Sequence, residues 1–251
     1  MVSVSSDEPG NEDRSDGLRL FYKVEPGDRQ EILAAATRVR RARGERFFGQ
    51  GADAQYFYIL QQGRVKLTQL TADGELVLVR LVVPGEAFGG VAAMGNQTYP
   101  VSAESADASV ALAWGGRTMD RLLRRHSQLA INFIAFLADR LHDMQARYEE
   151  LATEHVEQRL ARVLVRLVRR TGKRVEGGVL LDVRLSRQDL AQMAGTSLFT
   201  VSRILSRWQD RGVIRSQQRR ILVCHPHGLV TIAENLPHRD GSIRTPSDDG
   251  H

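Results

Sequence analysis

Residues 184–214 read RLSRQDLAQMAGTSLFTVSRILSRWQDRGVI, and this stretch decides the fold of the C-terminal part of the chain. Ser186, followed by an aspartate three residues later, predicts the start of a helix that runs through Ala194. Gly195 then supplies a turn, because it can take a backbone conformation that other residues resist. The next two residues, either of which can cap a helix, begin a second helix that ends near Arg211.

Two helices that cross this tightly need a small residue at the crossing and apolar residues in a shared core. The spacing Ala-x3-Gly-x5-Val-x2-Ile from Ala191 to Ile204 meets both needs, together with Leu190 and Leu205. This joint pattern predicts a helix-turn-helix, whose second helix enters the major groove of duplex DNA. Residues 213–223 then read as two strands around a basic tip, which is the wing of a winged helix-turn-helix.

The second helix of this motif places its N-terminal side chains against base edges. Arg203 suits the bidentate contact with guanine, and a phosphate contact or a solvent-exposed position is the alternative. Leu198 and Phe199 either pack on thymine methyl groups or are buried against the protein. Ser197, Thr200 and Arg207, together with the wing residues Arg219 and Arg220, are expected to hold phosphates. The predicted DNA-binding residues are Arg187, Gln188, Thr196, Ser197, Leu198, Phe199, Thr200, Ser202, Arg203, Arg207, Arg219 and Arg220.

Charge is concentrated in the same part of the chain. Residues 155–224 hold 15 Arg or Lys against 5 Asp or Glu, a net charge of +10, whereas the whole chain has +5 and the remainder therefore −5. A basic C-terminal part on an acidic remainder is typical of a nucleic-acid-binding protein, although a solvated arginine-rich face gives the same count.

The N-terminal half shows short strands separated by turns. A short helix over 26–36 precedes them, and Asp73-Gly74 and Pro84-Gly85 mark turns between them. The expected strands are 56–60, 65–70, 76–83, 101–104 and 110–114. Strands of this length at this spacing predict a small antiparallel barrel or jelly roll.

A long helix follows the strands and carries a narrow apolar stripe. The stripe repeats at spacings of 3, 4, 3, 4 and 3 and consists of Ile134, Leu137, Leu141, Met144, Tyr148 and Leu151. A helix packed on its own barrel and a parallel two-stranded coiled coil are the alternatives, and a strict heptad stripe favours the coiled coil. We therefore expect a homodimer, with the start of the helix also packed on the barrel. A second amphipathic helix, 155–170, is expected to end in a basic loop over 169–178.

The fold class that follows is α+β, with an N-terminal antiparallel β-barrel (jelly roll), a long dimerisation helix and a C-terminal winged helix-turn-helix. The expected parts are a disordered leader (1–17), an effector domain (18–126), the dimerisation helix (127–153), the DNA-binding domain (154–232) and a disordered tail (233–251). The chain has no apolar run long enough to span a membrane and no signal peptide, so we expect a cytoplasmic protein. No Walker motif, metal-ligand cluster or nucleophile elbow is present, so an enzyme is not expected.

This order of domains resembles the CRP/FNR superfamily of bacterial transcription regulators over residues 18–232. The resemblance rests on Gly44-Glu45, Tyr58-Ile59-Leu60-x-x-Gly63-x-Val65-x-Leu67, Pro84-Gly85-Glu86-Ala87-Phe88-Gly89 and Thr200-Val201-Ser202-Arg203. It implies a homodimer with a cyclic-nucleotide-binding-like effector domain, a palindromic DNA site with half-sites about one helical turn apart, and RNA polymerase as a partner.

The chain departs from the family pattern at the effector site. Cyclic-nucleotide-binding members follow Phe-Gly with a glutamate and later place an arginine on the phosphate, whereas here these positions are Gly90 and Tyr99. No Lys, Arg or His lies between Arg80 and Arg117, so a cyclic nucleotide would lack its charged partner, and an effector other than cyclic AMP is expected. The predicted effector-binding residues are Gly89, Gly90, Val91, Tyr99, Pro100, Val101 and Ser102.

Other effectors remain open at this point. The segment ending Tyr99-Pro100-Val101-Ser102-Ala103 resembles that of members that respond to nitrogen oxides, some through haem. His126 and His142 are then candidate ligands, with a solvated side chain as the default for His142. Effector-independent DNA binding is a further alternative. Cys224 is the single cysteine, which excludes a cysteine-ligated iron–sulfur cluster and leaves a core position or a redox switch for this thiol. Leu198-Phe199 replaces the family's common Arg-Glu, so the DNA site is expected to differ from the usual one.

Overall fold

The computed structural model describes residues 19–90, 95, 97–217 and 220–236, and the chain divides between Thr153 and Glu154 into two units. The expected leader and residues 237–251 of the expected tail lie outside the described residues. The first unit consists of α2 (Pro26–Ala34), β1 (Thr37–Arg41), β2 (Arg46–Phe48), β3 (Tyr56–Gln62), β4 (Val65–Leu70), β5 (Leu76–Val82), β6 (Ala87–Phe88), β7 (Ser102–Ser105), β8 (Ser109–Gly115), α4 (Gly116–Arg125) and α5 (Ser127–Thr153). The second consists of α6 (Val156–Thr171), β9 (Gly172–Val175), β10 (Gly178–Leu181), α7 (Arg187–Ala194), α8 (Leu198–Asp210), β11 (Ile214–Gln217), β12 (Arg220–Val223) and α9 (Pro226–Ala233).

The strands of the first unit form two antiparallel four-stranded sheets, in the orders β1-β8-β3-β6 and β2-β7-β4-β5. Side chains from both sheets meet in one core, which includes Phe47, Tyr58, Leu67 and Ala103. The two sheets therefore face each other, as expected for a jelly roll. The predicted antiparallel barrel is confirmed. The five expected strands correspond to β3, β4, β5, β7 and β8, with ends that differ by at most two residues, whereas β1, β2 and β6 were not predicted as strands.

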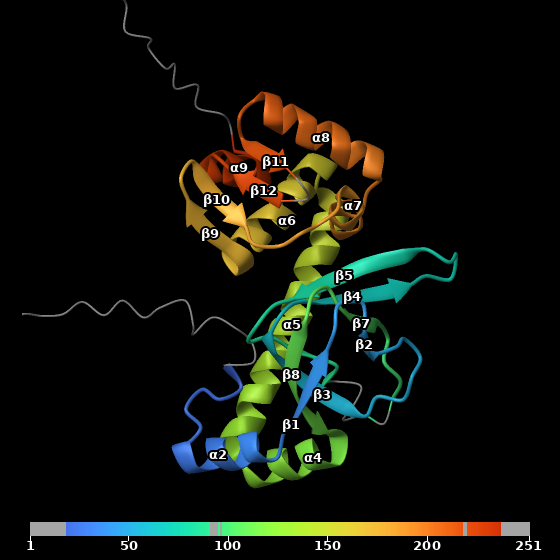
Figure 1. Ribbon diagram of the computed structural model, residues 1–251, viewed down its shortest axis with the longest axis vertical. Coiled ribbons are helices and arrows are strands. Elements are labelled where there is room, and N and C mark those ends of the chain that lie inside the picture. Colours follow the sequence, from blue (N-terminus) through green and yellow to red (C-terminus); the bar gives the residue numbers. More distant parts are fainter. Residues whose placement is uncertain (1–18, 91–94, 96, 218–219, 237–251) are drawn as a thin grey trace, which may run out of the picture. The chain divides into compact units, whose positions relative to one another are not determined.

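Strand β3 explains why the first unit needs helices. Tyr58 and Leu60 point into the barrel, whereas Phe57 and Ile59 alternate to the other face of the sheet and belong to a second core. That core contains residues from α2, α4 and the first turns of α5, and Trp114 donates a hydrogen bond of 2.8 Å to the carbonyl of Ile32. The three helices thus cover an apolar outer face that would otherwise meet water (Figure 1).

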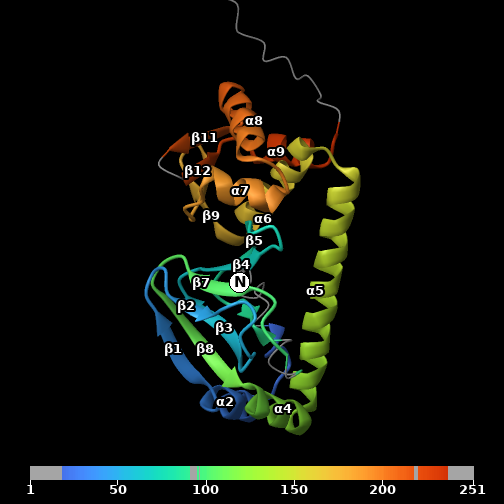
Figure 2. The ribbon, with the colours of Figure 1, turned by 90° about the vertical axis from the view of Figure 1, so that its right-hand side faces the viewer.

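Helix α5 has two different halves. Its first turns bury Leu129, Phe133 and Phe136 against the sheet, and the Asn132 amide donates to the carbonyls of Leu20 and Tyr22. This confirms that the start of the helix packs on the barrel. Beyond it the helix continues as a single rod beside the strands (Figure 2), with large apolar side chains exposed along it.

The second unit has a four-stranded sheet in the order β11-β12-β10-β9, with helices α6 to α9. The predicted loop over 169–178 is wrong, because the chain forms the hairpin β9–β10 there. Every residue of β9 is exposed, so its sequence lacks the alternation of apolar and polar residues from which a strand is predicted. Helix α9, which packs on α6, and helix α4 were not predicted either.

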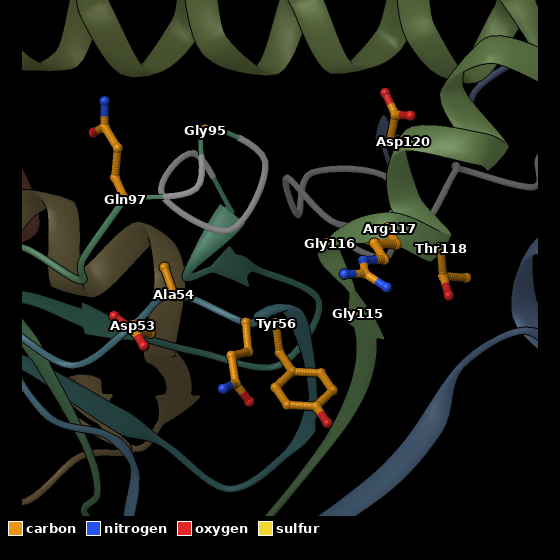
Figure 3. A pocket seen from close by; sticks show the side chains of 11 residues that line it. Asp53, Ala54, Tyr56, Gly95, Gln97, Gly115, Gly116, Arg117, Thr118 and Asp120 are labelled. Atoms are coloured by element: carbon orange, nitrogen blue, oxygen red, sulfur yellow. The ribbon is translucent and has the colours of Figure 1, made fainter.

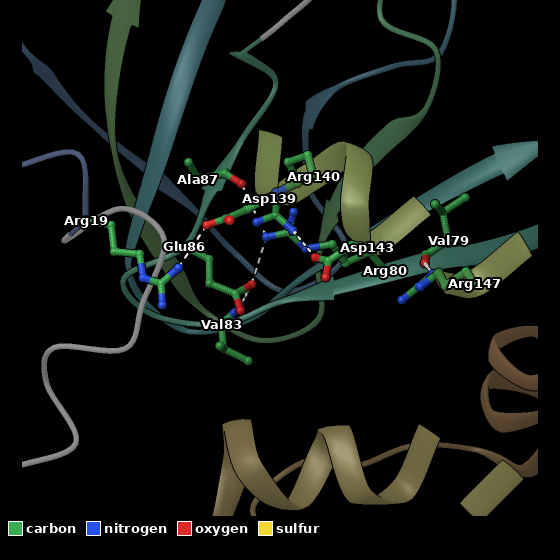
Figure 4. A network of polar contacts seen from close by, with 10 residues as sticks. All are labelled: Arg19, Val79, Arg80, Val83, Glu86, Ala87, Asp139, Arg140, Asp143 and Arg147. Carbon is green, nitrogen blue, oxygen red and sulfur yellow. Dashed lines mark hydrogen bonds and ion pairs between the residues drawn. The ribbon is translucent and has the colours of Figure 1, made fainter. Parts of the chain in front are cut away.

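Polar contacts join α5 to strand β5 and to the N-terminal residues of the first unit (Figure 4). Arg80 and Glu86 form an ion pair of 2.9 Å whose side chains are only 13% and 9% exposed. Arg147 donates to the carbonyl of Val79 at 2.7 Å. Because β5 carries both Val79 and Arg80, the buried pair lies beside the attachment point of the long helix.

We predict that Glu86→Ala destabilises the first unit by about 3–5 kcal/mol, because it leaves a nearly buried guanidinium without its carboxylate. The matched control is Asp139→Ala, which breaks a 2.8 Å pair with Arg19 whose side chains are 58% and 56% exposed. That change is expected to cost less than about 1 kcal/mol. Urea unfolding followed by Trp114 fluorescence in a Trp208→Phe background measures both, and equal losses would contradict the role given to burial.

Candidate nucleic-acid interface and effector domain

The first helix of the helix-turn-helix begins and ends as predicted. The Ser186 hydroxyl accepts a hydrogen bond of 3.0 Å from the backbone N–H of Asp189, whose carboxylate accepts one of 2.9 Å from the N–H of Ser186. Gly195 ends the helix in the left-handed conformation, with φ 61° and ψ 53°. Leu190 and Ala191 are buried at the crossing. The predicted helix-turn-helix is therefore confirmed, including the capping box at its start.

Helix α8 buries one face and exposes the other. Val201, Ile204, Leu205 and Trp208 are buried, whereas Phe199, Arg203 and Ser206 are exposed on the opposite side. Residues three and four apart on a helix share a face. Arg203 and Phe199 therefore project from the same outward stripe, one turn apart. Both were predicted to contact base edges.

Two predicted phosphate contacts at the start of α8 also hold the helix together. The Ser197 hydroxyl accepts a hydrogen bond of 3.2 Å from the N–H of Thr200, and the two hydroxyls lie 3.0 Å apart. This is a helix N-cap. The first turn of α8 is fixed by its own side chains before any ligand is present.

Helix α6 holds the motif at two further points, which sequence reasoning missed. The Arg159 guanidinium donates to the carbonyls of Ala194, at 2.9 Å, and Gly195, at 3.2 Å, so it caps the end of α7. Glu157 accepts from the indole N–H of Trp208 at 2.8 Å and from Arg207 at 3.1 Å. Both anchors join α6 to residues of the motif 35 to 51 positions later, a separation at which no local pattern identifies a partner.

The remaining predicted DNA contacts are placed unevenly. Arg187 and Gln188 are exposed in the first turn of α7, Thr196 and Ser202 are half-buried, and Arg220 is exposed on β12. Arg219 lies outside the described residues. Arg207 forms an ion pair with Glu157, which offsets part of its charge. Its contact with a phosphate stays a prediction.

The predicted effector residues lie at the barrel, but one of them fills its interior. Tyr99 is 3% exposed, its ring stacks on Phe48 with centroids 3.7 Å apart, and its hydroxyl donates to the carbonyl of Tyr56 and accepts from the N–H of the same residue. Burial raises the pKa of Tyr99 and that of Tyr58 above the ordinary value, so both phenols are neutral at physiological pH. Tyr99 is a buried residue of the barrel core, and its role in effector binding stays a prediction.

Gly90 is confined by packing. A Cβ at this position would lie 2.4 Å from a ring atom of Phe57. The family's glutamate would therefore displace a buried aromatic ring. Pro100 is exposed, Val101 packs against the barrel core and Ser102 accepts from the N–H of Gln50, whereas Val91 lies outside the described residues.

A cavity of about 1030 Å³ lies beside the barrel, between the β2–β3 loop and the start of α4 (Figure 3). Asp53, Tyr56, Gln97, Arg117 and Asp120 contribute polar groups to its wall. None of the described residues predicted for effector binding lines it. Sequence reasoning missed this cavity because its walls come from segments that are far apart in the chain.

The candidate haem ligands are separated. His126 is 5% exposed at the end of α4, with its ring nitrogens 3.3 Å from Asp28 and 3.6 Å from Glu31, whereas His142 is exposed on α5. At a rise of about 1.5 Å per residue they lie on the order of 24 Å apart, so they cannot ligate one iron within a chain. Among the described residues, no group of three or more His, Cys, Asp or Glu is placed to hold a metal ion, and no described helix is apolar and long enough to span a membrane. Cys224 is half-buried.

The predicted dimer stripe is exposed on α5, with one exception. Met144 is 68% exposed and Tyr148 77% exposed, and Ile134, Leu141 and Leu151 are more than half exposed. Leu137 is half-buried and packs on the core of its own barrel. The exposed stripe therefore begins with Ile134 and resumes at Leu141, one turn beyond Leu137.

Comparison with known proteins follows the same division of the chain. A model of the cyclic nucleotide-binding domain matches residues 38–126, and a model of the Crp-like helix-turn-helix domain matches residues 158–232. The cyclic AMP receptor protein of Thermus thermophilus is 30% identical over 200 residues, which cover 79% of this chain and 89% of the relative. The anaerobic regulatory protein of Bacillus subtilis is 23% identical over 229 residues, or 86% and 96% of the two chains.

A solved structure shares the fold. FixK2 from Bradyrhizobium japonicum superposes with a TM-score of 0.70 at 24% identity, covering 78% of this chain and 96% of that one. The two domain matches and the 30% identical relative agree with the jelly roll, the long helix and the capped helix-turn-helix described above. The chain belongs to the CRP/FNR superfamily, and it is a DNA-binding transcription regulator controlled through its N-terminal effector domain.

Proposed function

We propose that this chain acts as a homodimer that binds a palindromic site on duplex DNA, with one α8 reading each half-site. The observation that carries this proposal is the outward stripe of α8, where Arg203 is exposed one turn from the helix start in a segment of net charge +10. Duplex DNA is a polyanion, so a basic segment is drawn to it, and an exposed guanidinium in the groove recognises guanine. The exposed stripe of α5 supplies the contact between the two copies.

The wider role follows from the family. We propose that the dimer acts in the cytoplasm, that it contacts RNA polymerase at the promoters it binds, and that it has no catalytic activity. The relatives support this assignment, since they are regulators such as a transcriptional activator protein of Pseudomonas aeruginosa. Control through the barrel is retained in the proposal, but with a different effector.

We propose that the effector is not a cyclic nucleotide. Inside the barrel the rings of Phe48 and Tyr99 stack on each other, and on the outer face Phe57 lies where a side chain at position 90 would begin. The segment between Arg80 and Arg117 offers no Lys, Arg or His to a cyclic phosphate. An uncharged phenol cannot replace the charge-assisted contact that a buried phosphate needs.

The base contact is tested by Arg203→Ala. It is expected to relax the preference at one base pair of each half-site and to weaken specific binding by about 1–3 kcal/mol. Arg207→Ala is the matched control, because Arg207 lies on the same helix but is paired with Glu157, and it should leave base preference unchanged. Binding titrations against single-base variants of the selected site provide the measurement. A loss of affinity that is equal on every sequence would show that Arg203 contacts a phosphate instead.

The dimer contact is tested by Leu141→Lys. This substitution puts like charges across the stripe, so sedimentation should give the mass of a monomer. Because Leu141 is 59% exposed in the single chain, the monomer should stay folded, with an unchanged circular dichroism spectrum, although it loses the stability that dimerisation adds. His142→Lys introduces the same charge one residue away and should remain dimeric. An unchanged mass for Leu141→Lys would place the interface elsewhere.

The effector proposal is tested by thermal unfolding with millimolar cyclic AMP or cyclic GMP. A ligand that binds the native state raises the unfolding temperature in proportion to the logarithm of its concentration over its Kd. We expect no saturable shift from either nucleotide and no change in DNA affinity. A saturable rise with either one would contradict the argument from the filled barrel.

A further inference from the structure

The first turn of α8 presents two apolar side chains to solvent. Phe199 is 74% exposed and Leu198 is 47% exposed. Single exposed apolar residues are ordinary on protein surfaces. Here two of them are adjacent, and they occupy the turn that meets base edges in a helix-turn-helix. Their surroundings show what they can contact.

The position of Phe199 is fixed by its own helix. Ser197 caps the helix, and its hydroxyl lies 3.0 Å from that of Thr200, so the turn that carries Phe199 is held on both sides. Phe199 lies opposite the buried residues Val201 and Trp208. It therefore cannot turn into the core of its own domain, and it projects on the stripe that also carries Arg203.

The partner of this surface is a nucleic acid rather than an apolar protein groove. The residues from 155 to 224 carry a net charge of +10, which attracts phosphates over the whole region around α8. Arg203, one turn from Phe199, is exposed. An aromatic ring beside a cation in a basic region matches the floor of the major groove, where apolar methyl groups lie between lines of phosphates.

The chemistry of phenylalanine limits what it can read. The ring has no hydrogen-bond donor or acceptor, so against cytosine N4, adenine N6 or the guanine acceptors it would remove water without replacing the lost hydrogen bond. The thymine C5-methyl group is the apolar feature of the major groove. Contact with that methyl removes apolar surface from water on both sides.

We infer that Phe199, supported by Leu198, recognises a thymine methyl group in each half-site. One helical turn is about 5.4 Å along the axis of α8, and DNA base pairs are about 3.4 Å apart, so this thymine lies within one or two base pairs of the guanine read by Arg203. The inference rests on the proposed function and adds the base that this chain selects through Leu198 and Phe199.

The experiment removes the methyl group and leaves the protein unchanged. A site is first selected from random duplex DNA with the full chain, and the thymine beside the Arg203 guanine is then replaced by deoxyuridine, which pairs identically but lacks the methyl. We expect affinity to fall about fourfold per half-site, since burial of one methylene-sized group contributes about 0.8 kcal/mol. Replacing the T·A pair by C·G should weaken binding further, and 5-methylcytosine at that position should restore part of it.

The variant Phe199→Ala tests whether the affinity lost with deoxyuridine comes from contact with this ring. It should bind thymine and deoxyuridine sites equally, whereas Phe199→Leu should keep a preference for thymine. Because Phe199 is exposed, both variants should keep the unfolding temperature of the wild type, and Gln209→Ala, at the far end of α8, should keep the full response to deoxyuridine.

The outcomes separate the two proposals. If no sequence is enriched from the random pool, the proposed function fails. If a site with the Arg203 guanine is enriched but deoxyuridine binds as well as thymine, the function stands and the reading by Phe199 is wrong. If Phe199→Ala changes the sedimentation mass and not the response to deoxyuridine, the surface is a protein contact, and the inference is overturned.

Discussion

The position of α8 depends on the way the chain turns at Gly195. Gly195 takes the left-handed conformation there, and the backbone N–H groups of Gly195 and Thr196 bond back to the carbonyls of Gln192 and Ala191, which leaves the carbonyls of Ala194 and Gly195 to other partners. Arg159 satisfies those carbonyls from α6, and Glu157 holds Trp208 from the same helix. Because three helices are joined by charge-assisted hydrogen bonds as well as by apolar packing, the outward stripe of α8 is presented as part of a rigid domain. A recognition helix that is already ordered before binding loses less conformational entropy when it binds DNA.

The first unit obeys a different constraint. Strand β3 is buried on both faces, so the barrel must carry helices on its outside, and the last of these extends beyond the barrel with its apolar stripe exposed. Inside the barrel, the rings of Phe48 and Tyr99 stack on each other. Our proposal that the effector is not a cyclic nucleotide assigns sensing by this domain to a different chemistry.

Local signals predicted the parts of the structure that local interactions determine. The capping box at Ser186, the left-handed Gly195 and the β4–β5 hairpin follow from neighbouring residues, and all were predicted. The hairpin β9–β10 was missed because its outer strand buries nothing. The anchors Arg159 and Glu157 were missed because their partners are remote in sequence. Tyr99 was assigned to effector binding from its position in the family pattern, which identifies a place in the chain but not whether the side chain at that place packs inward. Leu137 stays a predicted dimer residue, and its heptad position did not show that it is also half-buried on its own barrel.

One reading helix per chain and a dimer made by α5 together require a symmetric DNA site, so the symmetry of the bound DNA tests both. The most direct measurement is selection of duplex DNA from a random pool by the full chain, followed by sequencing of the bound fraction. We expect an inverted repeat whose half-sites are about 10 base pairs apart, centre to centre, because two recognition helices of a symmetric dimer enter successive major grooves on one side of the duplex. Enrichment of a single unrepeated half-site, or of no sequence, would contradict it.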